Sequence, residues 1–235
     1  MTTCRTVALL PMKAHSARVK SKNFRDLAEK LLYAWILETL IGMDQIDQIV
    51  INTDAREILA ESGLTEGGKV MIRDRKPEIC GDFVSMNLVL ADDLAAVEAE
   101  TYVMTHTTNP LLSAATIGAA LTDFATARAK GDADSLFTVN KSQTRFYRDD
   151  GSAVNHDPDN LIRTQDLEPW YEENSGLYLF SADSFAQTKA RIGAKPMMFE
   201  TPMLEAVDID DAPRWFMAES LARRVAAGES LGDIV

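Results

Sequence analysis

The chain has 235 residues, of which 46% are hydrophobic and 26% are charged, values typical of a globular protein. Its formal net charge of −12 argues against nucleic acid as a general partner. No apolar run is long enough to span a bilayer and no apolar core of a signal peptide follows the first residues, so we expect a cytoplasmic protein with no membrane partner. Cys4 and Cys80 lie far apart in the sequence, which excludes a zinc site built on cysteines.

The first 30 residues are basic, in contrast to the acidic chain as a whole. They carry seven lysines and arginines against two acidic residues, which gives a local charge of +5. Such a cationic segment in an acidic protein is expected where a small polyanion is drawn into one cleft. The cationic residues are Arg5, Lys13, Arg18, Lys20, Lys22, Arg25 and Lys30.

An apolar run at 6–10 predicts a short buried strand, and a loop of small and cationic residues follows it over 11–23. Backbone N–H groups and lysine ammonium groups in such a loop can both bind phosphate, although a solvated basic loop is an alternative. The loop has neither the Walker A pattern nor Gly-x-Gly-x-x-Gly. Ser16 is not in a Gly-x-Ser-x-Gly elbow, which argues against a serine hydrolase.

Strands and helices alternate after this loop. The spacing of apolar residues predicts a helix over 31–41, a strand over 49–51, a helix over 55–61 and a strand over 69–73. Asp54 stands where it can cap the second of these helices. This order indicates βαβ units and a largely parallel sheet, whose ligands bind beyond the carboxyl ends of the strands. The first loop lies at such an end.

The second half of the chain continues the alternation until about residue 140. Between 140 and 170 the periodicity weakens, and 149–151 has the composition of a hairpin turn. We therefore predict one α/β domain over 1–235, with a small excursion from the sheet at 140–170. The further predicted helices are 85–97, 114–130, 183–191 and 212–227, and the further predicted strands are 102–104, 135–139, 177–181 and 196–199.

Two carboxylates separated by one apolar residue follow the last predicted strand. If this segment is extended, Asp208 and Asp210 point to one face and Ile209 to the other. Two carboxylates on one face repel each other unless a cation lies between them, and such hard oxygen ligands suit Mg²⁺. The alternative is that Asp210 or Asp211 only caps the final helix, and Asp211 can do so while the other two bind metal.

Loops at strand ends contain further polar candidates. Arg163 and Gln165 precede a predicted strand and could bind a carboxylate or hydroxyl groups, although the stretch taken alone favours a solvated loop. His15 and His106 each follow a strand, where a histidine can act as a general base or only as a hydrogen-bonding residue.

Taken together and in order, these stretches resemble the acylneuraminate cytidylyltransferases, the CMP-sialic acid synthetase family. The resemblance extends from Val7 to about Glu219 and rests on several motifs, each weak alone. The matching stretches are the first loop with Pro11, Ser16, Lys22 and Asn23, then Arg75, Asp82 to Ser85, 108–111, 134–139, 163–167, 173–178 and Val207 to Asp210.

The resemblance implies the nucleotide-diphosphosugar transferase fold, which is Rossmann-like, and Mg²⁺-dependent transfer of CMP from CTP to an acidic sugar with release of pyrophosphate. It also implies a homodimer in which the excursion forms the interface. The resemblance implies that Lys13 and Lys22 bind the triphosphate of CTP, that Asn23, Arg75 and Ser85 contact its cytosine or ribose, and that Ser16 also belongs to the CTP site. It implies that Asp208 and Asp210 bind Mg²⁺ and form the catalytic set with Lys22. The implied residues of the sugar-acid site are His106, Arg163, Gln165 and Tyr178.

The chain departs from the family's pattern in both halves of the site. Lys13 replaces an arginine, Ala14 and His15 replace two glycines, and Ser175 replaces another glycine. His106 stands where the family usually has a glutamine that contacts the sugar. Two alternatives follow: a transferase of the same fold that acts on another acid, such as a phosphonate, or a nucleotide-binding relative without catalysis.

Overall fold

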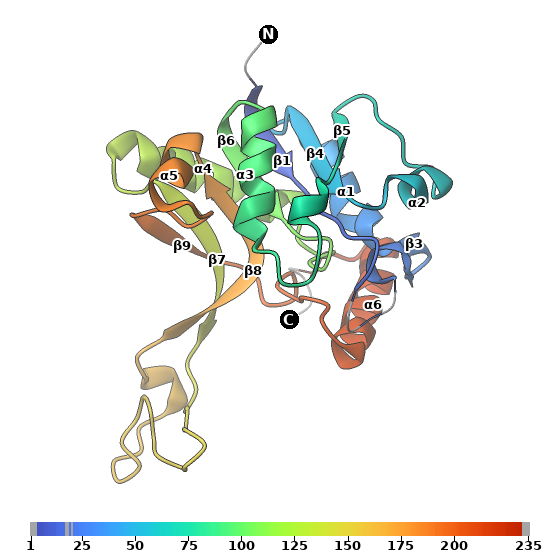
Figure 1. Cartoon of the computed structure of the whole chain (residues 1–235). Helices are drawn as coiled ribbons and strands as arrows, with labels where there is room; N and C mark the ends of the chain where they lie inside the picture. Colours follow the sequence, from blue (N-terminus) through green and yellow to red (C-terminus); the bar gives the residue numbers. More distant parts are fainter. Residues whose placement is uncertain (1–3, 17–18, 20, 232–235) are drawn as a thin grey trace.

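The structure is a computed structural model that describes residues 4–16, 19 and 21–231 (Figure 1). Its centre is a seven-stranded sheet with the order β5-β4-β1-β6-β8-β7-β9. Strands β1, β4, β5 and β6 are parallel, β8 is antiparallel to β6 and β7, and β9 is parallel to β7. The strands are β1 (Cys4–Leu9), β4 (Gln48–Thr53), β5 (Val70–Asp74), β6 (Ala99–Thr105), β7 (Ser135–Ser142), β8 (Trp170–Phe180) and β9 (Pro196–Glu200).

Helices cover both faces of this sheet (Figure 1). Side chains of β1 alternate between the faces, because successive residues of a strand point in opposite directions. Ala8 packs on the side of α1 and α4, whereas Val7 and Leu9 pack on the side of α3 and α5. The helices are α1 (Leu32–Gly42), α2 (Arg56–Glu61), α3 (Met86–Ala96), α4 (Ala114–Lys130), α5 (Ala182–Thr188) and α6 (Ala212–Ala226). The predicted mixed, mainly parallel sheet between helices is therefore confirmed.

Two local predictions change. A hairpin of β2 (Asp26–Leu27) and β3 (Lys30–Leu31), for which the apolar spacing predicts no strand, precedes α1. Asp54 does not cap α2, whose N-cap is Ala55 without a side-chain bond. Its Oδ1 instead accepts from the backbone N–H of Ala14 at 2.7 Å, so this carboxylate holds the first loop. By contrast, Asp211 caps α6 as expected, and its Oδ1 accepts from the N–H of Arg214 at 2.8 Å.

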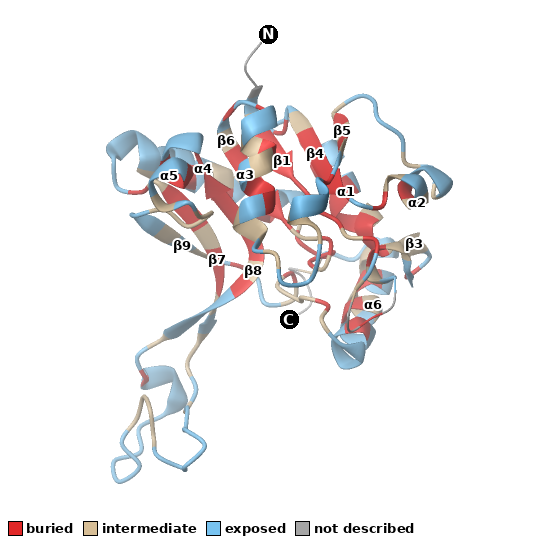
Figure 2. Cartoon of the chain, viewed as in Figure 1, coloured by how far each residue is buried: buried red, intermediate tan, exposed pale blue. Residues whose placement is uncertain are grey.

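The predicted excursion is an arm between β7 and β8 that leaves the body of the molecule (Figure 1). Both strands extend into it, and their pairing continues to Ser142 opposite Trp170. The predicted turn is present, since the N–H of Gly151 donates to the carbonyl of Arg148 at 3.0 Å. Most of the arm is exposed (Figure 2). It contains one 3₁₀ turn, Thr164–Asp166.

No helix among the described residues is both long enough and apolar enough to cross a membrane.

Candidate active site

A cleft of about 320 Å³ opens where β1 and β6 end, at the edge predicted from the parallel sheet. It collects seven of the residues that the sequence singled out. The remaining lining comes from neighbouring loop residues and from Met86 at the start of α3. The seven predicted residues that line the cleft are Lys13, Ser16, Lys22, Asn23, Arg75, His106 and Asp210.

The first loop is fixed by the sheet and not by glycine flexibility. The N–H of Met12 donates to the carbonyl of Asn52 at 3.0 Å, which continues the β1–β4 pairing past the strand end. Ala14 and His15, which replace two glycines of the family, both have negative φ, so their side chains cause no backbone strain. Arg18 and Lys20 of the predicted cationic cluster lie outside the described residues.

Asn23 is buried and holds the floor of the cleft. Its Nδ2 donates to the carbonyl of Lys13 at 2.9 Å, and its Oδ1 accepts from Thr107 Oγ1 at 2.7 Å. The amide thus ties the first loop to the loop that follows β6. The bonds to Lys13 and Thr107 give Asn23 a structural function in addition to the predicted nucleotide contact.

The two predicted phosphate-binding lysines differ in their surroundings. Lys13 is 37% exposed and its Nζ lies 2.9 Å from Asp82 Oδ1, a pair that lowers the pKa of that carboxyl. Lys22 is only 14% exposed, and its Nζ donates to the carbonyl of Ile209 at 2.7 Å and lies 3.5 Å from Asp210 Oδ1. Lys22 therefore connects the first loop to the acidic segment, whereas Lys13 forms a surface ion pair.

The acidic segment has the predicted alternation. Ile209 is fully buried under α6, and its N–H donates to the carbonyl of Thr108 at 2.9 Å. Asp210 lines the cleft, whereas Asp208 lines a different hollow of about 290 Å³. Burial and the nearby Asp210 raise the pKa of Asp208, while Thr108 and Lys22 act in the opposite direction.

These two carboxylates fit a divalent cation. Asp208 Oδ1 is buried and has no hydrogen-bond partner among the described residues, so it is available as a ligand. No group of three or more potential metal-binding side chains is present in the described part of the chain. Mg²⁺ is often held by one or two carboxylates together with substrate phosphates, which matches a pair without a third protein ligand.

A second hollow of about 340 Å³ adjoins the cleft, since Met86 lines both. Ser85 lines this second hollow and caps α3 by accepting from the N–H of Asn87 at 3.3 Å. Arg191 and Glu173 also line it. Arg191 Nη2 lies 3.6 Å from Glu173 Oε1, and the guanidinium stacks 3.8 Å above the ring of Tyr178.

His106 lines the cleft within electrostatic reach of Lys22 and Arg191. Burial, followed by the positive charges of Arg191 and Lys22, lowers its pKa to about 3, with Asp210 acting in the opposite direction. The imidazole is therefore neutral near pH 7. A histidine with so low a pKa is a weak base, which favours hydrogen bonding over the general-base alternative.

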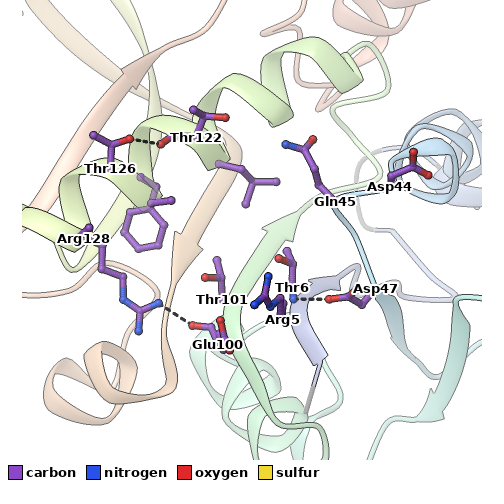
Figure 3. A pocket seen from close by; sticks show the side chains of 14 residues that line it. Arg5, Thr6, Asp44, Gln45, Asp47, Glu100, Thr101, Thr122, Thr126 and Arg128 are labelled. Carbon is purple, nitrogen blue, oxygen red and sulfur yellow. Dashed lines mark hydrogen bonds between the residues drawn. The ribbon is translucent and has the colours of Figure 1, made fainter. Parts of the chain in front are cut away.

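A larger hollow of about 920 Å³ lies at the opposite end of the sheet, near the start of β1 and β6 (Figure 3). Two of its polar side chains bond within the protein: Asp47 accepts from the N–H of Thr6 at 2.8 Å, and Arg128 donates to the carbonyl of Glu100 at 2.9 Å. None of the predicted site residues lines this hollow.

A family model described as cytidylyltransferase matches residues 7–210. The chain belongs to this family. The resemblance inferred from the motifs is thus confirmed, and the chain is a nucleotidyltransferase. The matched range begins in β1 and ends at Asp210, so it includes both the first loop and the acidic segment of this cytidylyltransferase.

Relatives and a solved structure agree with this assignment. An N-acylneuraminate cytidylyltransferase of Streptococcus agalactiae is 24% identical over 87% of this chain, which spans half of that relative's length. A pseudaminic acid cytidylyltransferase of Campylobacter jejuni is 22% identical, over 88% of this chain and 91% of the relative. The structure of a CMP:2-keto-3-deoxy-manno-octonic acid synthetase complexed with CTP covers 96% of this chain and all of that one, with a TM-score of 0.61 and 15% identity. This last likeness supports the fold.

Three predicted acceptor residues of the cytidylyltransferase lie away from the cleft. Arg163 and Gln165 are on the arm, where Arg163 Nε pairs with Asp166 Oδ2 at 2.7 Å and the carbonyl of Gln165 accepts from Gln143 at 3.0 Å. Tyr178 is fully buried, so its ring has no exposed surface to offer a ligand.

The hydroxyl of Tyr178 is also fully engaged. It donates to Glu173, accepts from Arg191 Nη2 at 2.9 Å and lies 3.3 Å from Ser175 Oγ. Burial raises the pKa of Tyr178 to about 12. Of the residues bonded to Tyr178, Glu173 and Arg191 line the second hollow, and Arg191 belongs to none of the quoted motifs. A single sequence holds no signal for it, because its contacts with Tyr178 form only in the folded chain.

Ser175 has a backbone conformation that favours glycine, the family's residue at this position. Its φ is 56°, in the left-handed region where a Cβ costs about 1 kcal/mol relative to glycine. The serine hydroxyl compensates in part by contacting Tyr178 Oη.

Proposed function

We propose that the protein transfers CMP from CTP to a hydroxyl of an acidic sugar in the presence of Mg²⁺ and releases pyrophosphate. The observation that carries this proposal is the contact of Lys22 with the acidic segment: its Nζ lies 3.5 Å from Asp210 Oδ1 in the cleft, and its charge acts on Asp208, which has a buried oxygen without a hydrogen-bond partner among the described residues. A buried cation and two carboxylates at the carboxyl end of the sheet suit a nucleoside triphosphate and its metal.

The reaction needs charge neutralisation and alignment more than a covalent nucleophile. The acceptor oxygen forms a bond to the α-phosphorus, and the bond from that phosphorus to the bridging oxygen breaks. Pyrophosphate leaves with the electron pair, and the hydroxyl proton passes to solvent. Lys13 and Lys22 would neutralise phosphate oxygens. Asp208 and Asp210 would hold Mg²⁺, which when bound offsets phosphate charge and lowers the pKa of a nearby hydroxyl.

The second hollow would receive the acceptor. It adjoins the cleft at Met86, and its charged residues, Arg191 and Glu173, carry opposite charges. The two sequence relatives are named for N-acylneuraminate and pseudaminic acid, which supports a nine-carbon or related acidic sugar as the acceptor.

The first test is pyrophosphate release from CTP, ATP, GTP and UTP with Mg²⁺, across a panel of acidic sugars and phosphonates. We expect release with CTP and one sugar acid only. Release with a phosphonate alone would replace the proposed acceptor with the other acid considered from the sequence. Tight CTP binding without release from any member of the panel would support the non-catalytic alternative.

His106→Gln is expected to change acceptor preference, because it places the family's usual amide beside Arg191 and Lys22. We expect kcat/KM ratios between sugar acids to shift by about tenfold, the effect of one altered polar contact. The pKa of His106 is about 3, so the imidazole stays neutral between pH 5 and 8. The pH profile of the variant should therefore overlay that of the wild type. Loss of a limb of the profile near pH 6 to 7 would instead identify His106 as the general base.

We further propose that the arm joins two copies of the chain. It exposes several large apolar side chains, and two of these, Phe146 and Trp170, stack with their ring centroids 5.3 Å apart. A second copy would cover this surface and could bring Arg163 and Gln165 to its partner's acceptor hollow. The remaining exposed apolar side chains of the arm are Tyr147, Leu161, Ile162 and Tyr171.

Leu161→Glu tests this interface, because Leu161 is 65% exposed and its replacement leaves the fold of one chain undisturbed. We expect the wild-type protein to have twice the chain mass of 25.9 kDa in light scattering, and the variant to dissociate at least about a hundredfold more readily. Leu88→Glu is the control, since Leu88 is 55% exposed on α3, away from the arm. A monomeric wild-type protein would contradict the proposal.

A further inference from the structure

A buried carboxylate lies on α3 behind the cleft. Asp93 is fully buried, and its Oδ2 has no hydrogen-bond partner among the described residues. Burial raises the pKa of this carboxyl, against the opposing effects of Asn52 and Arg73. A carboxylate in this position is costly to bury, so the contacts of its other oxygen indicate why it is there.

The other oxygen orients an amide. Asp93 Oδ1 accepts from Asn52 Nδ2 at 2.7 Å, and Asn52 Oδ1 accepts from Arg75 Nε at 3.0 Å. An asparagine amide has one donor side and one acceptor side. Because a carboxylate only accepts, Asp93 fixes the Asn52 amide with its oxygen toward Arg75.

Of these three hydrogen-bonded side chains, only that of Arg75 lines the cleft. Its Nη2 donates to the carbonyls of Met12 and Asn52, at 3.0 and 2.7 Å. With the bond from Nε, three of the five N–H groups of the guanidinium have protein partners. The two on Nη1 have none among the described residues, so they are the donors that remain for a ligand.

We propose that Asp93 is a positioning residue for nucleotide binding: through Asn52 it holds the guanidinium of Arg75 with its two remaining donors toward the oxygens of the bound nucleoside. The inference rests on the proposed function, since it requires a nucleotide in the cleft. Asp93 itself does not line the cleft, and its effect passes through two buried side chains, Asn52 on β4 and Arg75 in the loop after β5.

The neighbouring aspartate offers a matched control. Asp92 Oδ2 lies 2.8 Å from Arg73 Nη2, and Asp93 pairs with the other terminal nitrogen of the same arginine. Asp92 also contacts Lys76, at 2.5 Å, but it makes no bond to Asn52 or Arg75 in the described structure. Asp92→Asn and Asp93→Asn therefore each remove one carboxylate from Arg73, and only the second change reaches Arg75.

The experiment compares CTP dissociation constants by calorimetry, with Mg²⁺ present, for the wild type and both variants. A neutral amide at position 93 can offer Asn52 either a donor or an acceptor, so the bond from Arg75 Nε, one of the three that orient this guanidinium, is no longer fixed. We expect Asp93→Asn to weaken CTP binding about tenfold and Asp92→Asn to change it less than about twofold. The KM for CTP should rise in proportion while kcat at saturating CTP and the KM for the acceptor stay within about twofold.

Two further variants separate positioning from general destabilisation. Asn52→Ala keeps the Asp93–Arg73 pair and should give the same loss of CTP affinity. In an Arg75→Ala background, adding Asp93→Asn should cause no further loss, because the residue through which it acts is gone.

Equal losses from Asp92→Asn and Asp93→Asn, or a full additional loss in the Arg75→Ala background, would overturn the inference while leaving the proposed function intact. Failure of the wild-type protein to bind CTP would instead overturn the proposed function, and this inference with it.

Discussion

Asp210→Asn is expected to lower Mg²⁺-dependent turnover by about a thousandfold, the scale of losing one group that stabilises charge in the transition state. Asp210 lines the cleft and lies 3.5 Å from Lys22, with Asp208 close enough to respond to its charge. An amide keeps the size of the side chain but offers the cation a neutral ligand. The readout is the initial rate of pyrophosphate release over a Mg²⁺ titration, with the melting temperature measured on the same sample.

Asp211→Ala is the matched control, because the adjacent aspartate has a purely structural contact. Its Oδ1 caps α6, and loss of such a cap costs about 1 kcal/mol of stability. We therefore expect opposite results: lower stability with turnover retained for Asp211→Ala, and retained stability with turnover lost for Asp210→Asn. Turnover near the wild-type rate in Asp210→Asn would remove Asp210 from the proposed metal site.

Most of the fold follows from local patterns of apolar residues. A strand buried on both sides is a short continuous apolar run, whereas a helix that covers a sheet repeats apolar residues every three or four positions. The run at 6–10 is β1, and the spacing at 31–41 is α1, each displaced by one or two residues. The β2–β3 hairpin gave no such signal. Its strands have two residues each, and its turn uses positive φ at Ala28 and Glu29, where glycine or asparagine would be expected.

The site was predictable where chain order alone brings residues together. Strand ends of a parallel sheet meet at one edge, so loops after β1 and β6 had to lie near each other. Hydrogen-bond partners were not predictable in this way. Asp54 binds the first loop and not its own helix, and Arg75 receives its orientation from Asn52, 23 positions earlier. Such pairs depend on the register of neighbouring strands, which cannot be read from a single sequence.

Arg163 and Gln165 illustrate a different limit. Their motif assigns them to the acceptor, yet they lie on an arm that leaves the body of the chain (Figure 1). Conversely, Arg191 has no motif but lines the hollow beside the cleft. A motif reports the chemistry of a residue, whereas its distance from the reacting atoms depends on topology and on which copy of the chain supplies it.

Lys22→Met is expected to lower kcat/KM by at least about a hundredfold, since a desolvated cation beside developing phosphate charge contributes on this scale. Lys22 Nζ is largely buried and also donates to the carbonyl of Ile209, so its loss both removes a charge and releases the segment that carries Asp208 and Asp210. Methionine retains most of the length and the apolar stem of the side chain. Steady-state kinetics with CTP as the varied substrate measures the effect.

Lys13→Met supplies the comparison, because it removes the same charge from an exposed position in the same cleft. Lys13 is 37% exposed and already paired with Asp82, so water and that carboxylate screen its interaction with phosphate. We expect a loss of about tenfold or less, and one that salt reduces, whereas the loss in Lys22→Met should persist at high ionic strength. A larger loss from Lys13→Met than from Lys22→Met would mean that the exposed lysine carries the triphosphate. The contact between Lys22 and Ile209 would then serve only to hold the loop.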